Sequence, residues 1–205
     1  MYENVKNVIF DVGSVLIGYR WHEVIMEYGY EPVKAFAVGH AMLDDEMWNK
    51  MDRGDVTFEE LLEYYKKKLP EETELIDYFF EHKEKMVVYR PYLYSKIEEL
   101  IKKGYRIYIL SNYSKVLFPA HSIEFPFMDK LSGMVISYTV NSVKPERKIY
   151  DELLSQYSLK PEECLFFDDR KANTDAAESL GITCVTVSRE DDILTAVDKL
   201  LDNRR

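Results

Sequence analysis

Short apolar runs without polar alternation recur along the chain and predict buried strands. The three strongest cover residues 8–10, 107–110 and 164–167, and a polar residue follows each of them. Unbroken apolar runs of this length are typical of parallel strands covered on both faces. Two weaker runs, at 134–136 and 183–187, complete an expected set of five strands.

Helical patterns separate these runs. Apolar residues recur at helical spacing over four segments: 94–103, 145–157, 173–180 and 191–201. Gly104 and Gly181 follow two of these segments as C-terminal stop signals. Strands that alternate with helices predict βαβ units, and therefore an α/β fold built on a doubly wound, Rossmann-like parallel sheet.

Residues 17–90 carry a different pattern. Helical spacing is clear around 58–65 and 75–79, and no convincing strand is present. Thr57 with Glu60 three residues later matches a capping box, which predicts that a helix begins directly after Thr57. We interpret this stretch as an all-helical insertion that follows the first strand.

The insertion divides the chain into two expected parts. The α/β core comprises residues 1–16 and 91–205, and the helical insertion comprises residues 17–90. Movement of one part relative to the other would need hinges where the chain passes between them. We expect these hinges near 16–18 and 89–91.

Composition and charge exclude several classes of partner. The chain has 205 residues and a formal net charge of −10, which argues against duplex nucleic acid and against an anionic membrane surface. Two cysteines are too few for a disulfide framework, and neither a signal peptide nor a membrane-length apolar run is evident. We therefore expect a cytoplasmic protein, and a monomer is the simplest prediction for this size.

Polar side chains stand where the predicted strands end. Asp11, Ser111 and the pair Asp168–Asp169 directly follow the three strongest apolar runs. Open parallel sheets bind ligands at the carboxyl ends of their strands. The fold would bring these residues to one edge, although they are far apart in sequence.

The residues around these positions resemble the four motifs of the haloacid dehalogenase (HAD) superfamily. The four segments are Asp-Val-Gly-Ser-Val-Leu from Asp11, Ser111-Asn112, Lys-Pro-Glu-Arg-Lys-Ile-Tyr from Lys144, and Asp168-Asp169 with Asn173. The first and third forms are similar to the subfamily that contains bacterial α-glucose-1-phosphate phosphatases. In that family, a helical cap inserted after the first strand folds over the active site, and the helical insertion fits this arrangement.

The resemblance implies a nucleophile and a metal site. Asp11 would attack phosphorus to give an aspartyl-phosphate. Mg²⁺ would be held by Asp11, the backbone carbonyl of Gly13 and Asp169, with Asp168 bound directly or through water. Adjacent carboxylates repel one another unless a cation neutralises them, so the pair of aspartates itself favours a metal.

The resemblance also implies a phosphate-binding set, to which Gly13 belongs. Ser111 and the backbone N–H of Asn112 would hold the phosphoryl oxygens, and Lys144 would offset their charge. The proline after Lys144, expected at a helix start, fits the motif. Asn173 would either support the site from behind or cap the helix that follows.

Gly13 is where the sequence departs from the family. Most phosphatases of the superfamily carry an acidic residue two positions after the nucleophile, which protonates the leaving group. A sugar 1-phosphate releases a comparatively acidic hydroxyl, so we predict a Mg²⁺-dependent hydrolase of small sugar phosphates of this kind. A replacement acid could also come from the helical insertion, where Tyr19, Arg20 and His22 follow the motif closely.

Two alternatives remain open at this stage. A metal-free dehalogenase would also lack the second acid, but the Asp168–Asp169 pair counts against it. A catalytically weak protein that binds a phosphorylated ligand would have no need of Asp11 as a nucleophile. Within the helical insertion, Trp21, Trp48 and Arg53 are candidate contacts to a small phosphorylated metabolite, although aromatic residues there also serve to fill a small core.

Overall fold

The computed structural model describes residues 2–203, and five parallel strands form its central sheet. Their order is β5-β4-β1-β6-β7, and each neighbouring pair is parallel. The strands are β1 Asn7–Phe10, β4 Arg106–Ser111, β5 Gly133–Ile136, β6 Cys164–Asp168 and β7 Thr183–Thr186. All five strands predicted from apolar runs are confirmed, as is the doubly wound α/β class.

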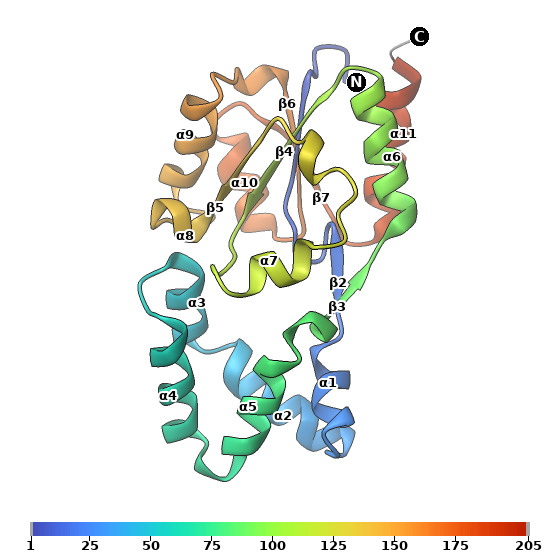
Figure 1. Ribbon diagram of the computed structural model, residues 1–205. Helices are drawn as coiled ribbons and strands as arrows, with labels where there is room; N and C mark the ends of the chain where they lie inside the picture. The colour runs from blue at the N-terminus through green and yellow to red at the C-terminus, as the bar shows by residue number, and fades with distance from the viewer. Residues whose placement is uncertain (1, 204–205) are drawn as a thin grey trace.

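Alternating side chains of each strand supply two separate cores. In β1, Val8 and Phe10 pack into one apolar cluster, whereas Ile9 packs into the other. Successive side chains of a strand point to opposite faces, so an unbroken apolar run fills both cores at once. One face is covered by α6 Pro91–Lys102 and α11 Glu190–Asn203, and the other by α9 Arg147–Gln156 and α10 Lys171–Glu178 (Figure 1).

The helical insertion lies beyond one end of the sheet (Figure 1). Its helices are α1 Trp21–Glu27, α2 Pro32–Leu43, α3 Glu46–Arg53, α4 Phe58–Lys68, α5 Thr73–Glu81 and the 3₁₀ turns η1 Pro70–Glu72 and η2 Lys83–Met86. The predicted capping box is confirmed, because Thr57 accepts from the Glu60 N–H while Glu60 accepts from the Thr57 N–H.

The expectation of an insertion without strands is wrong at its two ends. β2 Ile17–Tyr19 and β3 Val87–Tyr89 pair as an antiparallel ribbon where the chain enters and leaves the insertion. Three-residue strands are too short to show alternation in the sequence. The ribbon lies where the hinges were expected, so the two connections are hydrogen-bonded to each other.

The start of α9 also differs from its prediction. The helix begins at Arg147, because Glu146 has an extended backbone (ψ 134°) and serves as the N-cap. Pro145 precedes that cap, and the Lys144–Pro145 peptide bond is cis. The proline therefore shapes the loop before the helix and is not its first residue.

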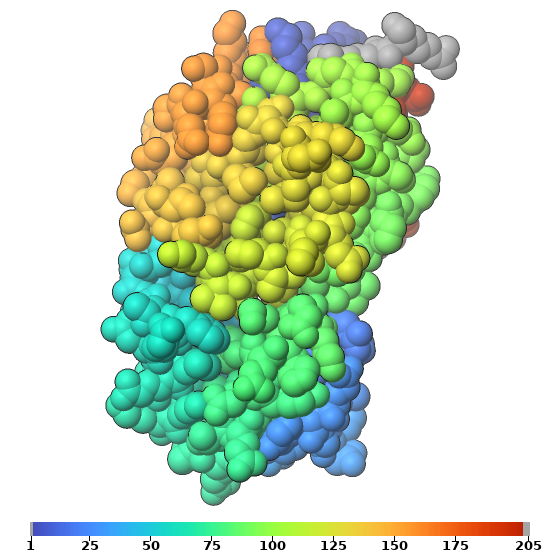
Figure 2. Space-filling model, in the orientation of Figure 1, coloured from blue at the N-terminus to red at the C-terminus, as the bar shows by residue number. Residues whose placement is uncertain are grey.

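The remaining elements are short and lie on the core side of the junction. They are α7 Leu117–Ser122, α8 Ser137–Val140 and the 3₁₀ turns η3 Met128–Lys130 and η4 Pro161–Glu163. Figure 2 shows the end of the insertion that holds α3 pressed against the segment that holds α8. Cys164 and Cys184 are both free thiols. Within residues 2–203, no helix combines the length and apolar character that a membrane span requires.

Candidate active site

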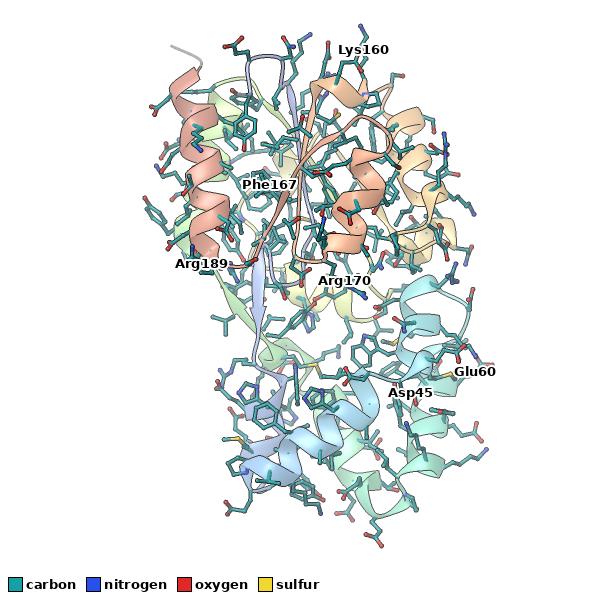
Figure 3. All side chains as sticks on the ribbon, turned by 180° about the vertical axis from the view of Figure 1, so that it is seen from behind. Asp45, Glu60, Lys160, Phe167, Arg170 and Arg189 are labelled. Carbon is teal, nitrogen blue, oxygen red and sulfur yellow. The ribbon has the colours of Figure 1, made fainter. Side chains whose placement is uncertain are left out.

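The strand ends bring the predicted residues together at the edge of the sheet that faces the helical insertion. Asp11 follows β1 directly, Ser111 ends β4 and Asp168 ends β6. In Figure 3, Arg170, just beyond β6, lies at this edge, whereas Lys160 lies at the opposite end of the sheet. The Ser111 hydroxyl donates to Asp11 Oδ1 at 2.6 Å, which fixes that carboxylate from the neighbouring strand.

Lys144 forms ion pairs with the aspartates at the ends of β1 and β6. Its ammonium contacts Asp168 Oδ2 at 2.6 Å, Asp11 Oδ1 at 2.9 Å and the Leu110 carbonyl at 2.9 Å, and only 1% of its side chain is exposed. All three ammonium donors therefore have acceptors. The side chain of Asn112 holds the loop in place, since it accepts from the Lys144 N–H at 2.7 Å and donates to the Lys144 carbonyl at 3.0 Å.

The two oxygens of Asp11 differ in their surroundings. Oδ1 accepts from the Ser111 hydroxyl, the Val12 N–H and the Lys144 ammonium, whereas Oδ2 receives no hydrogen bond from residues 2–203. Burial raises the pKa of Asp11 to about 7; Lys144 opposes this rise and Asp168 adds to it. Burial alone would lower the pKa of Lys144, but the two carboxylates outweigh it and raise that pKa. The arrangement leaves one carboxylate oxygen available for chemistry.

Asp168 is held on every side. Its Oδ1 accepts from the Arg170 N–H at 2.8 Å and from Asn173 Nδ2 at 2.9 Å, and its Oδ2 accepts from Lys144 and, at 3.1 Å, from Asn173. Asn173 lies inside α10 and not at its N-cap, which is Arg170. The helix-cap alternative for Asn173 is therefore wrong, and its side chain instead orients Asp168.

The oxygens that remain fit a hard divalent cation. Asp11, Asp168 and Asp169 each offer one oxygen, and these three atoms lie within 4.8 Å of one another. Asp168 is already engaged by Lys144 and Asn173, which leaves Asp169 as the freer carboxylate donor of the adjacent pair. Burial and the neighbouring Asp168 raise the pKa of Asp169. An all-oxygen set of this kind suits Mg²⁺.

Tyr19 occupies the space beside Gly13. A Cβ on Gly13 would lie 2.5 Å from the Tyr19 hydroxyl oxygen, so the pocket wall admits no larger side chain there unless Tyr19 moves. The Tyr19 hydroxyl is 3.4 Å from that of Tyr113, which in turn lies 2.7 Å from His121 Nδ1. His121 Nε2 faces the Lys83 carbonyl at 2.7 Å. A hydroxyl thus stands where the family usually places a carboxylate.

A pocket of about 230 Å³ lies between the helical insertion and the core, next to these groups. It is lined by Tyr19, Trp21, Leu43, Trp48, Asp52, Met86, Asn112, Tyr113, Leu117 and His121. Of the candidate contacts in the insertion, Trp21 and Trp48 line the pocket. His22 and Arg53 do not: the ring of His22 stacks on Phe36, and Arg53 pairs with Glu146.

Three residues that line the pocket were not predicted from the sequence: Asp52, Tyr113 and His121. Tyr113 directly follows the Ser111-Asn112 motif, so its place in the sequence offered a signal. Asp52 precedes a turn at Gly54 that is visible in the sequence, but nothing there indicates which way its carboxylate points.

The model of the haloacid dehalogenase-like hydrolase family matches residues 5–181. The chain is 27% identical over 208 residues to acyl-CoA dehydrogenase family member 10 of mouse, an alignment that covers 96% of this chain and 19% of that protein. It is 32% identical over 87 residues to D-ribitol-5-phosphate phosphatase of Bacteroides thetaiotaomicron, with 40% of this chain and 42% of that enzyme covered. The chain thus spans less than half the length of either curated relative.

A solved structure extends the likeness to the fold. A HAD family enzyme from Bacteroides thetaiotaomicron, in complex with magnesium and inorganic phosphate, has a TM-score of 0.72 and 21% sequence identity. The match covers 89% of this chain and 93% of that chain. At this level of identity the likeness shows a shared fold.

Proposed function

The chain belongs to the haloacid dehalogenase-like hydrolase family, and on that premise we propose that it is a Mg²⁺-dependent phosphomonoester hydrolase acting on a small sugar phosphate. One observation carries the proposal. Asp11 is held through Oδ1 by Ser111 and Lys144, while its Oδ2 receives no hydrogen bond from residues 2–203. An oriented carboxylate with one free oxygen can act as the nucleophile in an attack on phosphorus.

The chain's own residues suit both halves of such a reaction. Asp11 Oδ2 would form a bond to phosphorus as the bond to the leaving oxygen breaks, and Lys144 and Ser111 would hold Oδ1 still during the attack. Water would then attack phosphorus, releasing phosphate and restoring the Asp11 carboxylate. Asp11, Asp169 and the Gly13 carbonyl would hold Mg²⁺, which when bound would offset the charge of the phosphoryl group and of the carboxylates.

The pocket supports a small substrate. Its volume of about 230 Å³ and the walls formed by Trp21 and Trp48 favour a compact organic group. The relative named for D-ribitol 5-phosphate supports a small phosphorylated metabolite. A sugar 1-phosphate is the member of this class whose leaving group needs least protonation. The cytoplasmic location and monomeric state expected from the sequence remain predictions.

Phosphate release from a substrate panel tests this function. Purified protein would receive α-glucose 1-phosphate, ribitol 5-phosphate, glucose 6-phosphate, nucleotides and 2-haloacids, each with Mg²⁺ or with EDTA. We expect phosphate release that requires Mg²⁺ and disappears in Asp11→Asn. Asp44→Asn is the matched control, because Asp44 is an exposed aspartate of the helical insertion.

Three results would contradict parts of the proposal. Halide release in EDTA would make the protein a dehalogenase. A lack of turnover, together with thermal stabilisation by a sugar phosphate, would make it a binding protein. Faster cleavage of primary esters than of anomeric phosphates would refute the preference for sugar 1-phosphates while leaving the hydrolase assignment intact.

A further inference from the structure

Gly13 lacks the acidic side chain that most phosphatases of the family carry at this position. Tyr19 occupies the space that such a side chain would fill. The Tyr19 hydroxyl oxygen lies 2.5 Å from the position of a Gly13 Cβ. Burial raises the pKa of the Tyr19 phenol, so Tyr19 is a weak proton donor to a leaving oxygen near neutral pH. General acid–base catalysis is most efficient when the pKa of the group lies near the operating pH. The better acid would therefore be a group in the pocket wall whose pKa is lower than that of Tyr19.

Asp52 is the carboxylic acid among the residues that line the pocket. It shares the wall with Tyr19, Tyr113 and Asn112, and it is only partly exposed. No residue within 2–203 donates a hydrogen bond to its carboxylate or forms an ion pair with it. An unpartnered carboxyl group facing a largely apolar pocket is unusual for a purely structural residue.

The backbone around Asp52 belongs to the helical insertion but is hydrogen-bonded to the core. The Ser137 hydroxyl donates to the Asp52 carbonyl. The Ser137 hydroxyl oxygen also accepts from the Tyr113 N–H at 2.9 Å. Tyr113 directly follows Asn112, so Ser137 ties Asp52 to the loop expected to bind phosphate. The contact places Asp52 at the edge of the sheet that carries Asp11.

Neighbouring residues complete this attachment. Arg53 forms a two-pronged ion pair with Glu146, in which Nη1 lies 2.9 Å from Oε2, and the Arg53 carbonyl accepts from Asn141 at 3.3 Å. Gly54 ends α3 in the left-handed region (φ 85°), where a Cβ would lie 3.2 Å from the backbone of Tyr138. A bidentate arginine–carboxylate pair adds directional precision as well as energy. Glu146 follows Lys144 by two residues, so the attachment reaches the loop that carries Lys144.

We infer that Asp52 is the catalytic acid and base that stands in for the carboxylate missing at Gly13, an assignment that rests on the proposed function. Protonated Asp52 gives its proton to the leaving oxygen as the bond from phosphorus to that oxygen breaks and the bond from Asp11 to phosphorus forms. The resulting Asp52 carboxylate takes a proton from the water that attacks the aspartyl-phosphate. Phosphate leaves, Asp11 is restored as a carboxylate, and Asp52 is protonated again.

The surroundings of Asp52 are consistent with both tasks. Burial raises its pKa to about 7, and the negative charge of Asp11 adds to the rise. A group that gives and takes a proton in one cycle works best with a pKa near the operating pH. With such a group in place, the enzyme would also cleave esters whose leaving group is an ordinary alcohol.

Two esters of similar size separate an acid from a merely structural residue. Nitrophenolate leaves p-nitrophenyl phosphate without a proton, whereas the alkoxide of benzyl phosphate needs one. We expect Asp52→Asn to lower kcat/KM for benzyl phosphate by about 10²- to 10⁴-fold and for p-nitrophenyl phosphate by less than about 10-fold. The control Asp44→Asn should match wild type on both esters, and circular dichroism with a melting curve checks that each variant is folded.

The outcomes distinguish the possible failures. An equal loss on both esters in folded Asp52→Asn overturns the acid–base role, as does wild-type protein that cleaves only p-nitrophenyl phosphate. A selective loss of benzyl phosphate cleavage in Tyr19→Phe, with none in Asp52→Asn, transfers the role to Tyr19 and refutes the inference. Absence of Mg²⁺-dependent hydrolysis of either ester by wild type overturns the proposed function itself, and the role of Asp52 with it.

Discussion

Replacing Lys144 with methionine should destabilise the protein far more than the loss of a surface lysine would. The Lys144 side chain is 1% exposed, and its ammonium lies 2.6 Å from Asp168 and 2.9 Å from Asp11, so its removal leaves two buried carboxylates facing one another. Removal of one partner from a buried ion pair costs about 3–5 kcal/mol. For a domain of this size, each kcal/mol lowers the melting temperature by about 2–4 °C, which predicts a decrease of about 6–20 °C.

The loss of stability in Lys144→Met should depend on pH in a defined direction. The pKa of Asp11 in the folded protein is raised to about 7, above its value in the unfolded chain. Its contribution to stability is therefore fully present below about pH 4 and is lost as pH rises through 7. Without Lys144 this pKa should rise further, because the ammonium no longer favours the charged form. The deficit of Lys144→Met relative to wild type should grow between pH 5 and pH 8.

Thermal and urea unfolding in EDTA measure this effect, since a bound cation would otherwise replace the missing charge. Lys171→Met is the matched control, because the Lys171 side chain is 76% exposed and forms an ion pair with Asp175 on its own helix. The control should change the free energy of unfolding by less than about 0.5 kcal/mol. A Lys144→Met variant within about 1 kcal/mol of wild type at pH 8 would refute the argument that Lys144 neutralises this cluster.

Three further predictions concern the support of the site and the insertion. Asn173→Ala removes two hydrogen bonds to buried Asp168 and should lower the free energy of unfolding by about 1–3 kcal/mol in urea titrations; an unchanged midpoint would mean that Asp168 finds another donor. Thr57→Ala should cost about 1 kcal/mol and leave kcat unchanged, because the capping box is exposed, and Thr57→Ser should restore stability. Binding of Mg²⁺ to the metal-free protein should release part of a proton near pH 6.5 and almost none at pH 8.5, because burial raises the pKa of Asp11 to about 7. Calorimetry in two buffers of different ionisation enthalpy measures the number of protons released, and equal release at both pH values would contradict the prediction.

The sheet and the centre of the site were predictable because each depends on a local pattern. Parallel strands buried on both faces produce unbroken apolar runs, and their carboxyl ends converge by the geometry of the fold. Asp11, Ser111 and Asp168 could therefore be recognised in the sequence, because each is a polar residue directly after such a run. The role of Asn173 remained ambiguous, since its sequence position is compatible with either a helix cap or a contact to Asp168.

The surroundings of Gly13 could not be predicted in the same way, because they depend on distant contacts. Tyr19 reaches Gly13 from a three-residue strand that pairs with β3, some seventy residues further along the chain. Asp52 lines the pocket, its backbone carbonyl accepts from Ser137, and Arg53 next to it pairs with Glu146, 93 residues away. The glycine itself indicates only that one side chain is missing, and it is equally compatible with an enzyme that needs no acid and with one that takes its acid from elsewhere. The two cases differ in the side chains that the helical insertion brings to the pocket. Those side chains depend on how the insertion packs against the core, which the motif around Gly13 does not determine.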